Sequence, residues 1–181
     1  MSEWVLPFPE SAITCRHGVK DKLRPNGHRG TDFGKGPARA GAPIGAVSHG
    51  RVAVSSWHKN LGNVVVMKLA TGKFAYFCHL QEPGLAVGSY VAKAGDPIGK
   101  VGNTGAYSFG SHLHCGISDK VDGYISGAVY DIVEYVKEQQ AANKPKPAPK
   151  PVEASVEAPV AVEEPVAAPK PKKAPKAAEV E

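Results

Sequence analysis

Two histidines, His112 and His114, are separated by a single residue in the segment SHLHCGIS. This segment has the length and apolar character of a β-strand. Residues two apart in a strand point to the same face about 6 to 7 Å apart, so both imidazoles can approach one metal ion while Leu113 and Cys115 face away. On its own, a His-x-His pair is a moderately weak indication of a metal site.

A second pair of potential ligands, His28 and Asp32, stands in the segment HRGTDFG. The flanking Gly27 and Gly34 argue against a helix, and in an extended or gently turned segment the two side chains can share a face. Two imidazoles and one carboxylate suit Zn²⁺ and leave the open fourth position of a catalytic zinc site. Standing by itself, this motif would be interpreted as a surface turn with an Asp cap.

A further histidine, His79, ends the apolar run FAYFCHL. A strand of this composition is buried on one or both faces, where a lone histidine is more often a satisfied core residue than a catalyst. Its combination with the two other motifs makes it a candidate site residue. His17, His49 and His58 are interpreted as surface or satisfied core residues.

The elements that must position these residues are mainly β. Short β-branched and aromatic runs such as NVVVMKLA and KFAYFCHL alternate with turn signals such as TGK, which predicts antiparallel hairpins. After Ser126 apolar residues recur at helical spacing, which predicts a helix over about residues 128–140. The residues at this spacing are Val129, Ile132, Val133 and Val136. The expected fold is a compact antiparallel β-sheet core of short Gly-rich strands with a C-terminal helix.

The composition divides the chain into a folded domain at residues 1–143 and a tail at residues 144–181. The tail contains nine Pro, seven Lys and six Glu residues and has no Gly, Cys or aromatic residue. Such a segment cannot bury enough apolar surface to offset its ordering entropy. We therefore expect a disordered, extended tail.

Charge and hydropathy argue against several function classes. The net charge is +5 at pH 7, without the Lys/Arg stripe and interleaved aromatics of a nucleic-acid binder, so no nucleic-acid partner is expected. No stretch approaches the ~18 apolar residues of a transmembrane helix, and no signal peptide is recognisable, so we expect synthesis in the cytoplasm and no membrane insertion. Three cysteines, Cys15, Cys78 and Cys115, are too few and too widely spaced for a disulfide framework or a zinc knuckle.

Taken together, the motifs resemble those of the lysostaphin-type (glycyl-glycine endopeptidase-like) zinc metallopeptidases, which cut peptidoglycan peptides. The order and spacing of the pieces are kept across roughly residues 25–118. The pieces are HRGTDFG at 28–34, GNVVV at 62–66, YFCHL at 76–80, GDPIGKVGNTG at 95–105 and SHLH at 111–114. The resemblance implies a zinc metallopeptidase domain within residues 1–143.

The resemblance also implies roles for individual residues. His28, Asp32 and His114 would bind one Zn²⁺ per domain, and His79 and His112 would form the unligated catalytic pair. Three protein ligands leave a position for a water whose pKa the metal lowers toward ~7. The chain has no His-Glu-x-x-His motif, so a histidine is the natural group to accept the water's proton and return it to the leaving amine. Which of the two histidines is this base is left open.

Four residues are candidates for the substrate groove: Asn103, Thr104, Tyr76 and Tyr107. The first two belong to the GNTG loop, which the resemblance suggests as a groove wall and which could equally form a hairpin turn. The two tyrosines could instead be packing residues. Cys78 and Cys115 adjoin site histidines in their strands and are expected to point away from the metal as buried apolar residues.

The expected partner is bacterial peptidoglycan, cut at the cell wall by a chain that acts as a monomer. Family members that act from bacterial cells usually begin with an export signal or a membrane anchor, and neither is recognisable here. Together with the resemblance, this departure predicts a bacteriophage endolysin made in the host cytoplasm.

Two alternative functions stay open at this point. A catalytically inactive peptidoglycan-binding or virion-structural relative could keep the fold without the chemistry, although such a protein would be expected to have lost at least one of the site residues. A biotinyl or lipoyl carrier domain is suggested by the adjacent Met67 and Lys68. However, Lys68 lies within a predicted strand and not at a hairpin tip.

Overall fold

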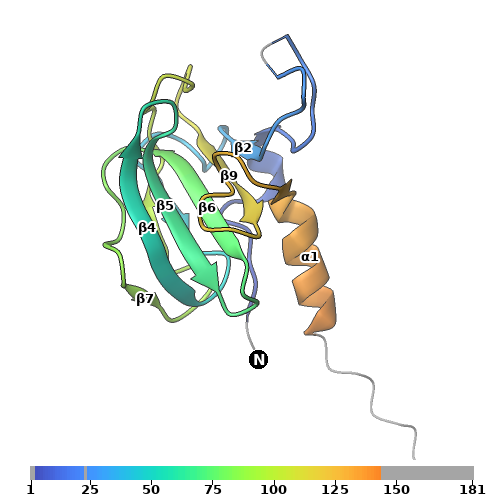
Figure 1. Cartoon of the computed structure of the whole chain (residues 1–181), viewed down its shortest axis with the longest axis vertical. Helices are drawn as coiled ribbons and strands as arrows, with labels where there is room; N and C mark the ends of the chain where they lie inside the picture. Colours follow the sequence, from blue (N-terminus) through green and yellow to red (C-terminus); the bar gives the residue numbers. More distant parts are fainter. Residues whose placement is uncertain (1–2, 23, 144–181) are drawn as a thin grey trace, which may run out of the picture. The chain divides into compact units, whose positions relative to one another are not determined.

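The structure is a computed structural model that describes residues 3–22 and 24–143. These residues form mainly antiparallel β-structure that ends in a helix, α1, as the sequence predicts (Figure 1). The tail predicted at residues 144–181 lies outside the described residues. Within residues 3–22 and 24–143, no helix is long and apolar enough to cross a membrane.

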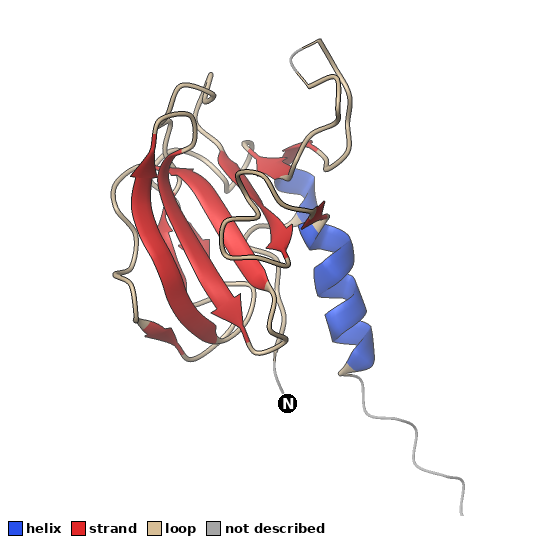
Figure 2. Cartoon of the chain, viewed as in Figure 1, coloured by secondary structure: helices blue, strands red, loops and turns tan. Residues whose placement is uncertain are grey.

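Eight strands of the described chain form one sheet, drawn as red arrows in Figure 2. Its strand order is β1-β2-β9-β6-β5-β4-β7, and β10 pairs with β9 outside this path. The separate pair of β3 and β8 forms a second, two-stranded sheet. The strands are β1 (Ile13–Cys15), β2 (Thr31–Phe33), β3 (Pro43–Gly45), β4 (Gly50–His58), β5 (Gly62–Leu69), β6 (Phe74–Leu80), β7 (Tyr90–Val91), β8 (Pro97–Lys100), β9 (Leu113–Ser118) and β10 (Val129–Tyr130). A short 3₁₀ helix, η1 (Glu10–Ala12), precedes β1.

The central strands β4, β5 and β6 form two successive hairpins, in agreement with their β-branched and aromatic composition. The predicted turn between β5 and β6 closes where the N–H of Gly72 donates to the carbonyl of Leu69 at 3.0 Å. Gly72 has a φ of 83°, which a residue with a Cβ rarely adopts. β6 then pairs on its other side with β9, which brings the predicted FAYFCHL and SHLH segments side by side.

The two faces of the sheet carry different clusters of buried side chains. The main core also contains residues of β3, β8 and α1, and alternate positions of β5 and β6 contribute Val65, Met67, Ala75 and Phe77 to it. The intervening positions form a smaller cluster of Val64, Val66, Tyr76 and Cys78. This alternation is the two-residue period of a strand with both faces covered. The candidate site is built on the face of the smaller cluster.

The C-terminal helix starts later than the helical spacing predicts. The predicted range of about 128–140 becomes α1 (Ile132–Ala142), and Val129 lies in β10 instead. Asp131 sets the boundary, because its extended backbone breaks the helix and its carboxylate accepts a hydrogen bond from the N–H of Val133 at 2.8 Å. The buried side of α1 packs against β9 and the N-terminal segment, where Tyr135 contacts Trp4 edge to face at 5.7 Å.

Candidate active site

The structure brings the five predicted site residues together. Asp32 lies on β2, His79 on β6 and His114 on β9, whereas His28 precedes β2 and His112 directly precedes β9. His28 and His114 are 86 residues apart in the sequence, yet their side chains are in contact. The rings of His79 and His114 lie 6.0 Å apart between centroids, so the two predicted groups adjoin each other.

Three of these side chains, those of His28, Asp32 and His114, each place one potential ligand atom close to the other two. Asp32 Oδ1 lies 2.8 Å from His114 Nδ1 and 3.1 Å from His28 Nε2. The two imidazole nitrogens are themselves 3.1 Å apart. A tetrahedral zinc ion with ligand bonds of about 2.0–2.1 Å would separate such atoms by about 3.3 Å. The triangle formed by Asp32 Oδ1, His114 Nδ1 and His28 Nε2 therefore has nearly the size that a bound zinc ion requires.

The hydrogen bonds of His28 show why this triangle calls for a cation. His28 Nδ1 lies 3.1 Å from the carbonyl oxygen of Arg16, which can only accept, so Nδ1 is the donor. In the neutral ring Nε2 is then an acceptor, and it faces the carboxylate oxygen of Asp32. Two facing acceptors repel each other unless a proton or a metal ion lies between them. The donor set of two imidazoles and one carboxylate therefore fits Zn²⁺.

The protonation states of the triangle also suit a metal. Burial by itself would raise the pKa of Asp32, but the hydrogen bonds and charges of His114 and His28 outweigh it and hold that pKa well below its usual range. Arg24 lies 3.5 Å from the other carboxylate oxygen and adds positive charge. Burial lowers the pKa of His114, which favours the neutral imidazole. An ionised carboxylate and neutral imidazoles are the forms that bind metal ions.

Strand register explains how Asp32 and His114 meet. The two residues are directly opposite across the β2–β9 pair, so their side chains share one face of the sheet. Cys78 is opposite His114 across the β6–β9 pair and shares that face too. The prediction that Cys78 points away from the site side is therefore wrong, whereas its predicted burial, like that of Cys115, is confirmed.

Gly30 and Tyr76 support the ring of His114. A Cβ on Gly30 would lie 2.7 Å from His114 Cε1 and 2.7 Å from the carbonyl oxygen of Cys115, so only glycine fits there. Tyr76 is fully buried, its ring centroid lies 5.9 Å from that of His114, and its hydroxyl donates to the carbonyl of Arg29. Packing thus holds the ring of His114 against Asp32.

The rings of His79 and His112 form a second pair, 4.7 Å apart between centroids. His79 Nδ1 donates to the carbonyl of Thr104 at 2.7 Å, and His112 Nδ1 donates to the carbonyl of Gly110 at 2.7 Å. Each neutral ring therefore keeps Nε2 as an acceptor. His112 Nε2 lies 3.8 Å from Asp32 Oδ1, next to the triangle.

His79 reaches this position through a bulge in β6. Between Phe77 and Leu80 the pairing with β5 contains one extra residue on β6, and His79 has a left-handed φ of 63°. The extra residue resets the strand alternation, so Leu80 joins Phe77 in the main core and His79 turns toward His112. Burial lowers the pKa of His79 to about 4, which keeps the ring neutral at neutral pH. The same bulge explains why the predicted direction of Cys78 fails.

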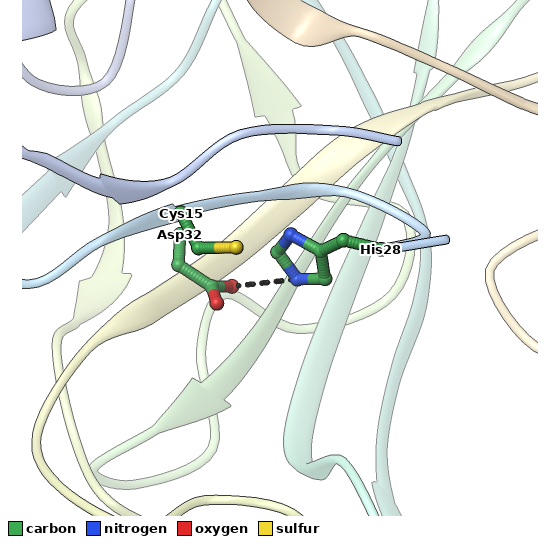
Figure 3. A group of neighbouring side chains, drawn as sticks. All are labelled: Cys15, His28 and Asp32. Atoms are coloured by element: carbon green, nitrogen blue, oxygen red, sulfur yellow. Dashed lines mark ion pairs between the residues drawn. The ribbon is translucent and has the colours of Figure 1, made fainter. Parts of the chain in front are cut away.

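A further potential ligand, Cys15, lies beside the triangle. Cys15 Sγ and the ligand atoms of His28 and Asp32 all lie within 4.8 Å of one another. Figure 3 shows the thiol directed toward the Asp32 carboxylate and the His28 ring. No motif surrounds Cys15 in the sequence, and its register with β2 is visible only in the fold.

The sequence of this domain matches a known family over the segment that carries the site. Residues 26–125 match peptidase family M23. The chain belongs to this family. The predicted resemblance to lysostaphin-type metallopeptidases is thereby confirmed.

Solved structures of M23 peptidases and their relatives share the fold. The catalytic domain of the antimicrobial peptidase lysostaphin from Staphylococcus simulans is 28% identical, with a TM-score of 0.59, and the match covers 69% of this chain and 91% of that chain. LytU is 28% identical with a TM-score of 0.61, covering 75% of this chain and 91% of that chain. A zinc containing peptidase from Vibrio cholerae is 28% identical with a TM-score of 0.53, covering 62% of this chain but only 35% of that longer chain. The predicted mainly β fold with a C-terminal helix is confirmed.

The M23 domain has a cleft of about 990 Å³ at the site. All five predicted metal and catalytic residues line it. Its walls also include Arg24, His58, Tyr107, Phe109, Tyr124 and Ile125. Several of these side chains are exposed and apolar, so the cleft presents both a polar centre and an apolar rim.

The four predicted groove residues have different positions in the structure, and not all of them line the cleft. Tyr107 lines the cleft and is 63% exposed. Tyr76 is buried beneath the site and cannot reach the cleft surface. Asn103 Oδ1 accepts hydrogen bonds within its own loop, and Thr104 Oγ1 donates to β6. The GNTG loop therefore positions His79 and His112, the two predicted catalytic histidines.

Most of the further cleft residues, Phe109 and His58 among them, were not predicted as such. Phe109 is 82% exposed and lines the cleft. An aromatic residue within a segment rich in Gly and Ser was the available signal. His58 also lines the cleft, where its Nδ1 accepts from the N–H groups of Asn60 and Leu61 at 3.3 Å each.

Proposed function

We propose that this M23 chain is a zinc-dependent endopeptidase that hydrolyses peptide bonds of bacterial peptidoglycan. The observation that carries the proposal is the triangle of His28 Nε2, Asp32 Oδ1 and His114 Nδ1, with sides of 2.8 to 3.1 Å, beside a pair of anchored histidines. The similarity to lysostaphin and to other M23 peptidases supports the reaction class. The role of a bacteriophage endolysin stays a prediction from the sequence.

In this proposal His28, Asp32 and His114 hold one zinc ion. When bound, zinc lowers the pKa of a coordinated water toward ~7 and polarises the carbonyl of the scissile bond. The chain contributes one negative charge and two neutral imidazoles, so the site keeps a net positive charge when loaded. The hydrogen bond from His28 Nδ1 to the Arg16 carbonyl orients that ring for ligation through Nε2.

Of the two anchored histidines, we assign the general base to His112. His112 Nε2 is an acceptor at the edge of the triangle, and Asp32 Oδ1 at 3.8 Å stabilises the imidazolium that forms when this ring takes a proton. His112 can return that proton to the leaving amine. Burial makes protonation of His79 costly, so His79 is the poorer base of the pair.

The test is loss of turbidity in a suspension of purified peptidoglycan, with mass spectrometry of the soluble fragments. Zinc-loaded protein should clear the suspension and release peptide fragments, and removal of zinc by a chelator should stop both until zinc is restored. One zinc per chain without fragment release would instead identify a catalytically inactive binding relative. The absence of both bound zinc and released fragments would contradict the proposal as a whole.

A further inference from the structure

We propose that Cys15 is a fourth, displaceable ligand of the metal ion and closes the position at which water would otherwise bind. This inference rests on the metal site of the proposed function. It concerns a residue outside the predicted ligand set, and its consequence is a resting form of the enzyme whose metal is shielded by the chain's own thiol.

Strand register supplies the first observation. Cys15 on β1 is the partner of Asp32 on β2, and Asp32 is the partner of His114 on β9. Opposed residues in antiparallel strands present their side chains to the same face, with Cβ atoms about 4.5–5.5 Å apart. The three side chains therefore form a row across adjacent strands, with the thiol at one end of the row.

The second observation is the position of the sulfur atom. Cys15 Sγ lies within 4.8 Å of the ligand atoms of His28 and Asp32, and all three side chains are drawn in Figure 3. A zinc ion bound by sulfur at about 2.3 Å and by nitrogen or oxygen at about 2.0–2.1 Å separates these ligand atoms by about 3.5 Å. Ligation therefore requires the Cys15 side chain to bring Sγ closer to the triangle.

The thiol has polar neighbours that it would leave when it turns to the metal. Its Sγ makes a long contact of 3.8 Å with the carbonyl of the next residue, Arg16, and it also interacts with the side chain of Arg24. On ligation the thiol releases its proton to solvent, and the resulting thiolate is a soft ligand that zinc binds well. A set of His28, Asp32, His114 and Cys15 would complete the tetrahedron of a closed zinc site, which has no position for water.

Cys78 and Cys115 provide an internal comparison. Both are fully buried, Cys78 in the smaller cluster with Tyr76 and Val66, and Cys115 in the main core. Cys15 is only partly buried. A thiol reagent that enters the native protein should therefore distinguish Cys15 from the other two.

The test uses the full chain loaded with Co²⁺ in place of zinc, because a cobalt–thiolate bond produces a charge-transfer absorption in the near ultraviolet that nitrogen and oxygen ligands do not. The wild-type protein should show this band, and Cys15→Ala and Cys15→Ser should lose it while still binding one cobalt per chain. One cobalt per chain without the band in the wild type would overturn the role of Cys15 and leave the peptidase proposal standing. No bound cobalt or zinc would overturn both.

A second measurement is alkylation of the native protein by iodoacetamide, followed by peptide mass spectrometry. Zinc should protect Cys15 from alkylation, whereas Cys78 and Cys115 should stay unmodified with and without zinc. Equal alkylation of Cys15 in the two states would contradict ligation. Release of peptidoglycan fragments should be faster for Cys15→Ala than for the wild type, and a slower rate with full metal occupancy would overturn the shielding role.

Discussion

Asp32 Oδ1 and His114 Nδ1 lie 2.8 Å apart across the β2–β9 pair, although 82 residues separate them in the sequence. Two strands far apart in the chain must pair in one register before this contact exists. The metal binding proposed at this contact would therefore be coupled to the formation of the sheet, because the unfolded chain has no preformed site.

Replacement of Asp32 by Ala should abolish zinc binding, because it removes the anionic ligand that joins the two imidazoles. We expect no zinc in the purified variant by elemental analysis. Asp119→Ala is the matched control, since Asp119 is an exposed carboxylate paired with Lys73 away from the cleft. Asp119→Ala should keep one zinc per chain. Full zinc occupancy in Asp32→Ala would contradict the assigned ligand set.

Removal of zinc should lower the melting temperature of the wild-type protein. A ligand present at 100 times its Kd stabilises the folded state by about 2.7 kcal/mol. Thermal unfolding followed by circular dichroism, with and without a chelator, measures this shift. The melting temperature of Asp32→Ala should not respond to the chelator, and an equal response in both proteins would place the stabilising metal elsewhere.

His112→Ala should retain zinc and lose catalysis. The loss of a positioned general base lowers the turnover rate by about 10²- to 10⁴-fold. Zinc content and the rate of fragment release are measured on the same preparation, with His49→Ala as a control for a histidine outside the cleft. Release of zinc from His112→Ala would show that the division between ligands and catalytic residues is incorrect.

Gly30→Ala should weaken metal binding although it replaces no ligand residue. The added Cβ would lie 2.7 Å from both His114 Cε1 and the Cys115 carbonyl oxygen, which forces the His114 ring or β9 to move. Overpacking of this kind costs about 1–3 kcal/mol. Chemical denaturation and zinc titration measure the two effects. Gly110→Ala is the control, because a Cβ there meets no atom within 4 Å and should change neither quantity.

A chain that ends at Asn143 should unfold at nearly the same temperature as the full chain. The composition of residues 144–181 predicts that this segment adds no buried apolar surface to the domain. Differential scanning calorimetry of the two proteins provides the comparison. A large decrease in the truncated chain would mean that the tail packs on the domain.

That five side chains would come together at one candidate site was predictable from the sequence, because their chemical types and local spacing carry the signal. His28 with Asp32, the His112–His114 pair and the apolar strand before His79 are each short motifs whose residue types suit zinc or proton transfer. The mainly β fold was also predictable, since β-branched runs and Gly turns are local properties. The start of the helix was not, because the capping by Asp131 competes with the helical spacing of Val129.

The pairing of strands far apart in the sequence determined the side-chain directions that local sequence patterns could not predict. The bulge at His79 reverses the expected strand alternation, so the directions of His79 and Cys78 depend on how β6 pairs with β5 and β9. The same pairing buries Tyr76 beneath His114, and the β1–β2 register places Cys15 beside Asp32. A single-residue shift turns a side chain to the opposite face of a sheet. The residues of the candidate site were therefore predictable from the sequence, whereas their orientation and neighbours were determined by the tertiary structure.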